Sequence, residues 1–268
     1  MKKLSALVPF LLLAFRLPLA AAIDTSDNWC TDHSFHSDGM VSHSEVREQR
    51  LPAAGENVVD PGMNGSIHIH AWANADFQVK ACVQAAAADA STAAALVRQV
   101  TITDGPGRVV AKGPSSTPDH TWWSVSYEIW APSSANLQLT ANNGSISIEG
   151  LAGQIRAQTL NGSLKLKNVS GSVEAETTNG SLSVDLAGGA WQGKGLKLNT
   201  VNGSIQLHLP ENISANVAAS TVNGKVRTEF FANVNLDDPH SATFTLGAGG
   251  PQIEAHTVNG SVQISRQN

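Results

Sequence analysis

The chain is poor in charge, in tyrosine and in cysteine. Only 15% of its 268 residues are charged, a single tyrosine stands against 23 glycines, and there are two cysteines. The formal charge of -5 disfavours nucleic acid as a partner, because binding to phosphates depends on a basic surface. A hydrophobic content of 41% is too high for a chain that is disordered throughout. The length suits one large β domain or two small ones.

The first 22 residues predict export. They read MKKLSALVPFLLLAFRLPLAAA, with a basic start, an apolar run and an alanine exit, as in a secretory signal peptide cleaved near Ala22. A retained membrane anchor is the alternative, but Arg16 interrupts the run and leaves too few apolar residues to span a bilayer. We therefore expect an extracytoplasmic protein, in the periplasm, on the cell surface or secreted, with no transmembrane span after cleavage.

The remaining chain divides into three segments by composition. Residues 23–44 are polar, rich in His and Ser and without a period, which indicates a poorly ordered segment. Residues 45–141 contain alternating strand patterns and one Ala-rich stretch, for which we expect a short helix at about 89–98. Residues 142–268 are repetitive, and we expect residues 45–141 to cover one end of the repeats.

The repeat is clearest from Asn143 to Ala187, where five lines of nine residues follow one another: NGSISIEGL, AGQIRAQTL, NGSLKLKNV, SGSVEAETT and NGSLSVDLA. The fourth and sixth positions are apolar or small and the fifth and seventh polar, which is the alternation of a β-strand. Odd lines open with Asn and carry a large sixth residue, whereas even lines carry Ala there. The true period is therefore eighteen residues, with two short strands in each repeat.

Two architectures fit this period. Asn-Gly between alternating strands is a strong hairpin signal, which would give an antiparallel meander. In a parallel solenoid each residue would instead stack on its i+18 partner, about 4.8 Å away. That stacking places Lys167 between Glu149 and Asp185, and Arg156 beside Glu174, so that opposite charges meet. We therefore predict an all-β, single-stranded parallel β-solenoid (β-helix) with coils of about 18 residues.

The rhythm continues after residue 187 with looser spacing. TVNG recurs at residues 200–203, 221–224 and 257–260, which gives six coil starts in chain order. We expect Asn at the corners because it tolerates left-handed backbone angles, and Gly because it supplies positive φ. The corner pairs are Asn143-Gly144, Asn161-Gly162, Asn179-Gly180, Asn202-Gly203, Asn223-Gly224 and Asn259-Gly260.

These residues resemble a known family. The TVNGSI-type repeats after a signal peptide, the stretch LPENISANVAASTVNGKV and the closing LGAGGPQIEAHTVNGSVQI are similar to the bacterial putative-adhesin family of unknown function. The resemblance covers about residues 45–267. It implies an extracytoplasmic β-solenoid without a settled biochemical activity, and it carries over no catalytic residue.

Catalytic and metal-binding patterns are weak. Hydrolysis or lysis of a polysaccharide needs paired carboxylates, and the candidate pairs are Glu149 with Asp185, Glu174 with Glu176, and Asp237 with Asp238. Charge ladders and a turn explain all three. There is no GxSxG nucleophile elbow and no GGxGxDxUx calcium repeat. His68, His70, His33 and His36 are expected to be solvated surface residues, so we predict no metal site and no cofactor.

Two further features remain open. Cys30 and Cys82 either form a disulfide between the N-terminal segment and the β region or remain free thiols. Trp191 lies in a Gly-rich insertion, where an aromatic face suits ligand contact. We expect a non-catalytic, adhesin-like module of the cell envelope or surface that binds a polysaccharide or protein. The alternative is a polysaccharide hydrolase or lyase on the same scaffold, and the oligomeric state stays open.

Overall fold

The computed structural model describes residues 28–30, 39–103, 105–115, 119–188, 191, 193–230 and 238–267. The predicted signal peptide at residues 1–22 and most of the segment 23–44 lie outside these residues. Within the described part of the chain, no helix is long and apolar enough to cross a membrane.

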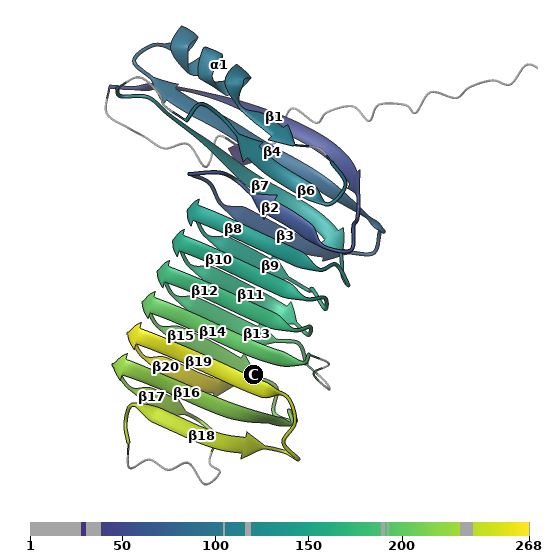
Figure 1. Ribbon diagram of the computed structural model, residues 1–268, viewed down its shortest axis with the longest axis vertical. Coiled ribbons are helices and arrows are strands. Elements are labelled where there is room, and N and C mark those ends of the chain that lie inside the picture. Colours follow the sequence, from purple (N-terminus) through teal and green to yellow (C-terminus); the bar gives the residue numbers. More distant parts are fainter. Residues whose placement is uncertain are drawn as a thin grey trace, which may run out of the picture.

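The described chain is an all-β structure with one α-helix, in which two ten-stranded sheets enclose a single hydrophobic core (Figure 1). The first sheet contains, in spatial order, β1 (Val41–Pro52), β4 (Asp76–Ala87), β7 (Trp122–Pro132), β3 (Ile67–Trp72), β9 (Ile146–Glu149), β11 (Leu164–Val169), β13 (Leu182–Leu186), β15 (Ile205–Leu209), β20 (Val262–Arg266) and β17 (Val226–Thr228). The second contains β18 (Ser241–Leu246), β16 (Ala215–Asn223), β19 (Gln252–Asn259), β14 (Gly195–Asn202), β12 (Val173–Asn179), β10 (Ile155–Asn161), β8 (Leu137–Asn143), β2 (Asn57–Asp60), β6 (Arg108–Lys112) and β5 (Thr101–Thr103).

Successive strands of the repeat lie in different sheets and pair in parallel with the equivalent strands of the next repeat. Ile155 pairs with Val173 in the second sheet and Leu164 with Leu182 in the first, both at the predicted offset of eighteen. The antiparallel meander is therefore wrong for this region. Inward residues at the alternate positions are buried, because both sheets cover them. The stack is solenoid-like, and no repeat encloses a core by itself.

The spatial order of the strands departs from the chain order at both ends of the stack. Strands β19 and β20 lie between the pair β14/β15 and the pair β16/β17 (Figure 1). At the other end, β2 and β3 lie between β6/β7 and β8/β9. The prediction of six coils in chain order is therefore wrong for the last two, which exchange places.

Antiparallel strands and the helix extend the stack at its N-terminal end. β1 pairs with β4, and β4 pairs with β7, both antiparallel. The helix α1 (Ala90–Gln99) lies where the sequence predicts it, and Asp89 caps it by accepting a hydrogen bond from Thr92 N at 2.9 Å. Arg47 of β1 donates to Val97 O and Val100 O at the other end of α1. The domain division at residue 141 stays a prediction.

A disulfide joins Cys30 and Cys82, whose Cα atoms are 5.2 Å apart. Cys30 belongs to the short 3-10 turn η1 (Asn28–Cys30), and Cys82 lies in the buried part of β4. The Gln84 side chain donates to Cys30 O at 2.5 Å, and Lys80 lies over the Trp29 ring at 5.6 Å. Together these contacts fasten the start of the described chain to the first sheet.

Candidate functional site

The Asn-Gly corners form one continuous row along the stack. Each corner asparagine after Asn64, in spatial order, donates a side-chain hydrogen bond from Nδ2 to Oδ1 of the asparagine in the preceding coil, at 2.7 to 3.0 Å. We call this row the asparagine ladder. In spatial order it consists of Asn64, Asn143, Asn161, Asn179, Asn202, Asn259 and Asn223.

The corner glycines are required by close packing and not, as predicted, by positive φ. A Cβ on Gly162 would lie 2.1 Å from Gly144 O, and one on Gly180 would lie 1.9 Å from Gly162 O. Within the described chain the only NGS glycine with positive φ is Gly65, and the ladder asparagines do not have positive φ. The expected left-handed corner is therefore wrong, and the coils instead approach too closely to admit a side chain.

Sequence reasoning missed the threonine that precedes five of the seven ladder asparagines by two positions. Thr159 is buried and donates from Oγ1 to Gly144 O at 2.8 Å. The equivalent bonds recur along the stack from Thr177, Thr200, Thr257 and Thr221. The signal was present in the sequence, because these residues open the TxNG motif. Their hydroxyls bond the same glycine carbonyls that exclude a Cβ, so the corner is fixed by two contacts.

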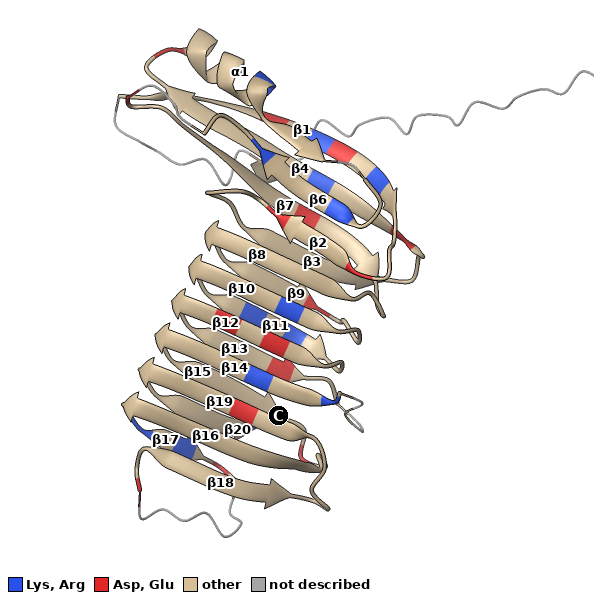
Figure 2. Ribbon diagram, viewed as in Figure 1, with Lys and Arg blue, Asp and Glu red and all other residues tan. Residues whose placement is uncertain are grey.

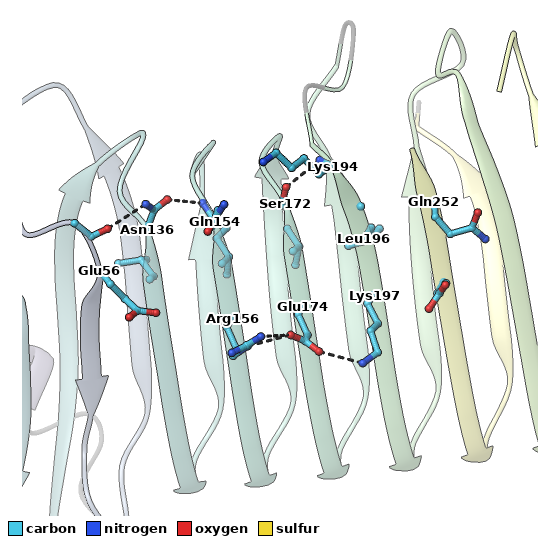
Figure 3. A pocket seen from close by; sticks show the side chains of 16 residues that line it. Glu56, Asn136, Gln154, Arg156, Ser172, Glu174, Lys194, Leu196, Lys197 and Gln252 are labelled. Carbon is cyan, nitrogen blue, oxygen red and sulfur yellow. Dashed lines mark hydrogen bonds and ion pairs between the residues drawn. The ribbon is translucent and has the colours of Figure 1, made fainter. Parts of the chain in front are cut away.

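The candidate site is the outer face of the second sheet, formed by the outward side chains of β8, β10, β12, β14 and β19. We call it the ladder face. A groove of about 690 Å³ crosses the beginnings of these strands (Figure 3). Polar side chains line it, and charges of both signs alternate along the stacked strands (Figure 2). The lining side chains used below are Gln154, Arg156, Glu174, Lys194, Lys197, Gln252 and Glu254.

An ion-pair row forms the floor of this groove. Arg156 contacts Glu174 at 2.8 Å, and Lys197 contacts the other oxygen of Glu174 at 3.0 Å (Figure 3). The predicted pair of Arg156 with Glu174 is therefore confirmed and extends to a third coil. Hydrogen bonds from Lys197 and then from Arg156 hold the pKa of Glu174 below its usual range. Glu174 is thus kept ionised and paired.

Two other rows run parallel to the ion pairs on the same face. Nearer the strand ends, Gln158 and Asn199 both donate to Glu176, at 3.2 and 2.9 Å. Next to the asparagine ladder lies an aliphatic row, in which Leu160, Val201 and Val222 are 48%, 41% and 56% exposed. A second hollow, of about 440 Å³, lies between these two rows. The rows are linked, because Lys197 also lies 3.7 Å from Glu176, and the aliphatic row is interrupted by Thr178 of β12.

The outer face of the first sheet is ordered less regularly. Lys167 pairs in register with Glu149, but a register shift between Leu166 and Val169 moves it away from Asp185. The predicted contact of Lys167 with Asp185 is therefore wrong. Asp185 instead contacts His208 in the next coil. The irregularity coincides with Asn168, whose φ is 52°.

The histidines are not gathered into a metal site in the described chain. His70 stacks on Trp130, with ring centroids 5.7 Å apart, and its Nε2 lies 3.3 Å from Glu128. No three His, Cys, Asp or Glu side chains of the described residues are placed to hold a metal ion. His33 and His36 lie outside the described residues.

The carboxylate pairs have other partners. Glu174 and Glu176 belong to separate rows of the ladder face, and Glu149 and Asp185 lie on the first sheet. Asp238 accepts hydrogen bonds from His240 N and Ser241 Oγ, which lower its pKa, and Asp237 lies outside the described residues. For Glu174 and Asp238 the shift is opposite to that of a general acid, whose pKa must rise.

Trp191 is not placed to contact a ligand, which corrects the expectation for this residue. Its side chain belongs to the hydrophobic core, with 9% exposure, and its indole nitrogen donates to Gly171 O at 3.2 Å. The ring fills space over the start of β12, and its Nε1 atom would lie 2.4 Å from a Cβ on Gly193. The Gly-rich insertion therefore supplies a core residue.

Comparison with known proteins gives a family and a set of distant structural neighbours. Residues 64–265 match the family model described as Toastrack DUF4097. No curated protein matches the chain.

Three solved structures are similar to this chain at low identity. A putative cell adhesion protein from Clostridium sporogenes is 10% identical, over 84% of this chain and 100% of that one, with a TM-score of 0.42. A putative adhesin from Bacteroides fragilis is 14% identical, over 83% and 97%, with a TM-score of 0.33. A putative lipid binding protein from Parabacteroides distasonis is 11% identical, over 84% and 97%, with a TM-score of 0.34. Likenesses at this level carry no argument about the ligand.

Proposed function

We propose that this chain, which belongs to the Toastrack DUF4097 family, is a non-catalytic binding module that holds an extended polysaccharide of the cell envelope across its ladder face. The observation that carries the proposal is the groove on that face, in which outward polar side chains lie at a regular spacing. Residues at equivalent positions of β10, β12, β14 and β19 lie in register, one strand spacing apart, about 4.8 Å, although their side chains differ from coil to coil. A row of polar groups at a constant spacing suits an extended ligand that is built of repeating units.

The groove offers groups that are not used by the fold. Lys194 and Glu254 have no ion-pair partner among the described residues, and the side-chain amide of Gln252 has no hydrogen bond there. Hydroxyl groups of a sugar can donate to the carboxylate and accept from the amine and the amide. The aliphatic row, which lies farther along the same strands and lines the second hollow, supplies apolar contact for a sugar ring. In this proposal the stack is one continuous parallel solenoid, so that these groups lie in a line along it.

The proposal places the protein outside the cytoplasm, after cleavage of the predicted signal peptide. The alternative, a hydrolase or lyase for the same polymer, requires a carboxyl group that carries a proton at working pH. Glu174, the charged residue at the centre of the groove floor, is paired with Arg156 and Lys197 and has a lowered pKa. This argues against Glu174 as the proton donor of such an enzyme.

The test incubates purified mature protein with insoluble peptidoglycan and a panel of polysaccharides, and measures both co-sedimentation and newly released reducing or unsaturated ends. The groove variant carries Lys194→Ala and Gln252→Ala, because neither side chain is bonded within the described fold. The matched control, Lys165→Ala, changes an exposed cation on β11 of the first sheet. We expect retention of the wild type and the control, and about a tenfold loss of affinity for the groove variant, equivalent to about 1.4 kcal/mol.

Two outcomes would overturn the proposal. Equal affinity of the groove variant and the control would show that the polysaccharide does not bind at the ladder face. Release of new chain ends by the wild type would replace the binding module with the enzyme.

A further inference from the structure

Seven Asn-Gly pairs occupy equivalent positions in one ladder. An Asn-Gly pair can lose the side-chain amide by deamidation without an enzyme. The backbone nitrogen of the glycine attacks Cγ of the asparagine side chain, ammonia leaves, and a five-membered succinimide forms. Water then opens the ring to aspartate or isoaspartate. The reaction needs no partner, but the glycine N–H must be free and the backbone must leave the extended conformation.

Six of the seven glycines are blocked by a hydrogen bond. Gly162 N donates to Asn179 O at 3.0 Å, and Gly180 N donates to Asn202 O at the same distance. The same bond to the next coil along the stack recurs at Gly65, Gly144, Gly203 and Gly260. In these coils the attacking nitrogen is already a donor inside a paired sheet, so the reaction must wait for local opening of the stack.

Gly224 is the exception, and the reason is topological. Its coil, β16/β17, is the last of the parallel coils in the stacking order, because β19/β20 precedes it in space. Strand β18 pairs antiparallel with the far edge of β16, but only from Ala215 to Ser220, and does not reach Asn223. No described residue accepts a hydrogen bond from Gly224 N. Asn223 holds its side chain by a single ladder bond, from Nδ2 to Asn259 Oδ1 at 2.8 Å, and its own Oδ1 accepts none from the described residues. The adjacent Val222 is 56% exposed.

We infer that Asn223 is the site at which this protein deamidates, and that the ladder protects the other six asparagines. Deamidation replaces the side-chain amide of Asn223 by a carboxylate, although the ladder needs a hydrogen-bond donor at this position. An aspartate at position 223 faces Asn259 Oδ1 with another oxygen acceptor, so the last ladder bond is lost. An isoaspartate also lengthens the backbone and disturbs the register of this last parallel coil. The change is therefore confined to one end of the stack.

The experiment uses the wild-type mature chain at mildly alkaline pH, sampled over days. Peptide mapping by mass spectrometry quantifies aspartate and isoaspartate at each of the seven sites. In the native protein we expect Asn223 to convert at least about tenfold faster than any other site, since only at this site does the attacking glycine nitrogen have no hydrogen bond to a described residue. In denaturant all seven should convert at similar rates, because the local sequences are nearly the same.

The denatured sample separates protection by the fold from differences in local sequence. A variant with Asn223→Gln should lose the native product without moving it to another coil, which checks the peptide assignment. Uniform conversion in the native chain would overturn the inference. Fastest conversion at an interior asparagine such as Asn161, or at the opposite end of the ladder at Asn64, would also overturn it.

Discussion

The corner and the groove lie on the same coils and follow opposite rules. At the corner every coil carries Asn-Gly, and each of these residues contacts the equivalent residue of the coil beside it. In the groove the same strands carry Arg156, Glu174, Lys197 and Glu254 in turn. A position that touches the backbone of a neighbouring coil admits one residue type, whereas an outward position only has to suit its neighbour's charge. Repetition therefore belongs to the fold, and variation along the same strands to recognition.

The largest effect is expected at a corner glycine. In Gly162→Ala the new Cβ would lie 2.1 Å from Gly144 O and 2.6 Å from its carbonyl carbon, so two coils must separate. We expect a loss of about 3 kcal/mol in the free energy of unfolding, measured by urea denaturation. The control is Gly188→Ala, because a Cβ there meets no atom within 4 Å. Equal losses in the two variants would contradict the close-packing explanation.

A smaller effect is expected when a ladder asparagine is removed. Asn161→Ala removes one bond to Asn143 and another from Asn179. The side chain is exposed, so we expect a loss of about 1 kcal/mol. Asn223→Ala at the end of the ladder breaks a single bond and should cost about half as much. Denaturation midpoints of the two variants give the comparison, and a cost at Asn223 equal to that at Asn161 would show that the bonds do not add along the row.

The smallest effect is expected in the groove, and it depends on pH. The folded-state pKa of Glu174 lies below its unfolded value, owing to Lys197 and Arg156. Its contribution to stability is therefore present above the unfolded pKa, about 4.3, and is lost as the pH falls through the lower folded value. We expect Glu174→Gln to lower the free energy of unfolding by a few tenths of a kcal/mol at pH 7. The fall in Tm at acidic pH should be smaller in this variant than in the wild type.

Salt provides the check on this last prediction. The difference between wild type and Glu174→Gln should shrink in high salt, because the side chains of the row are partly exposed. Glu254→Gln, on the same face but without an ion pair among the described residues, is the matched control. A pH dependence of the same size in both variants would show that the effect arises from the net charge of the face and not from the ion pairs of Glu174.

Periodicity predicted those parts of the structure that repeat at a constant interval. Alternation gave the strands, the offset of eighteen gave the parallel pairing of β10 with β12, and the Ala-rich stretch gave α1. The pair of Arg156 with Glu174 followed from the same offset. All of these depend on neighbours that the period itself identifies.

The remaining features depend on contacts that no period specifies. The shift between Leu166 and Val169 separates Lys167 from Asp185, and a local pattern of charges does not contain it. Trp191 was expected at the surface because its flanks are rich in glycine, yet its ring is covered by the core. The order of the last coils could not be predicted either, because the two TVNG repeats concerned are alike in sequence.

The exchanged position of β19 and β20 separates the order of synthesis from the order of assembly. The chain makes β16 and β17 first, yet their parallel partners are β19 and β20, which emerge later. Until then the edges of β14 and β15 that face β19 and β20 have no partner, and β16 can pair only with β18. A chain that folds from its N-terminus can therefore add coils in chain order only as far as β15. The final two coils must therefore form at the same time, so that their assembly is a single cooperative event.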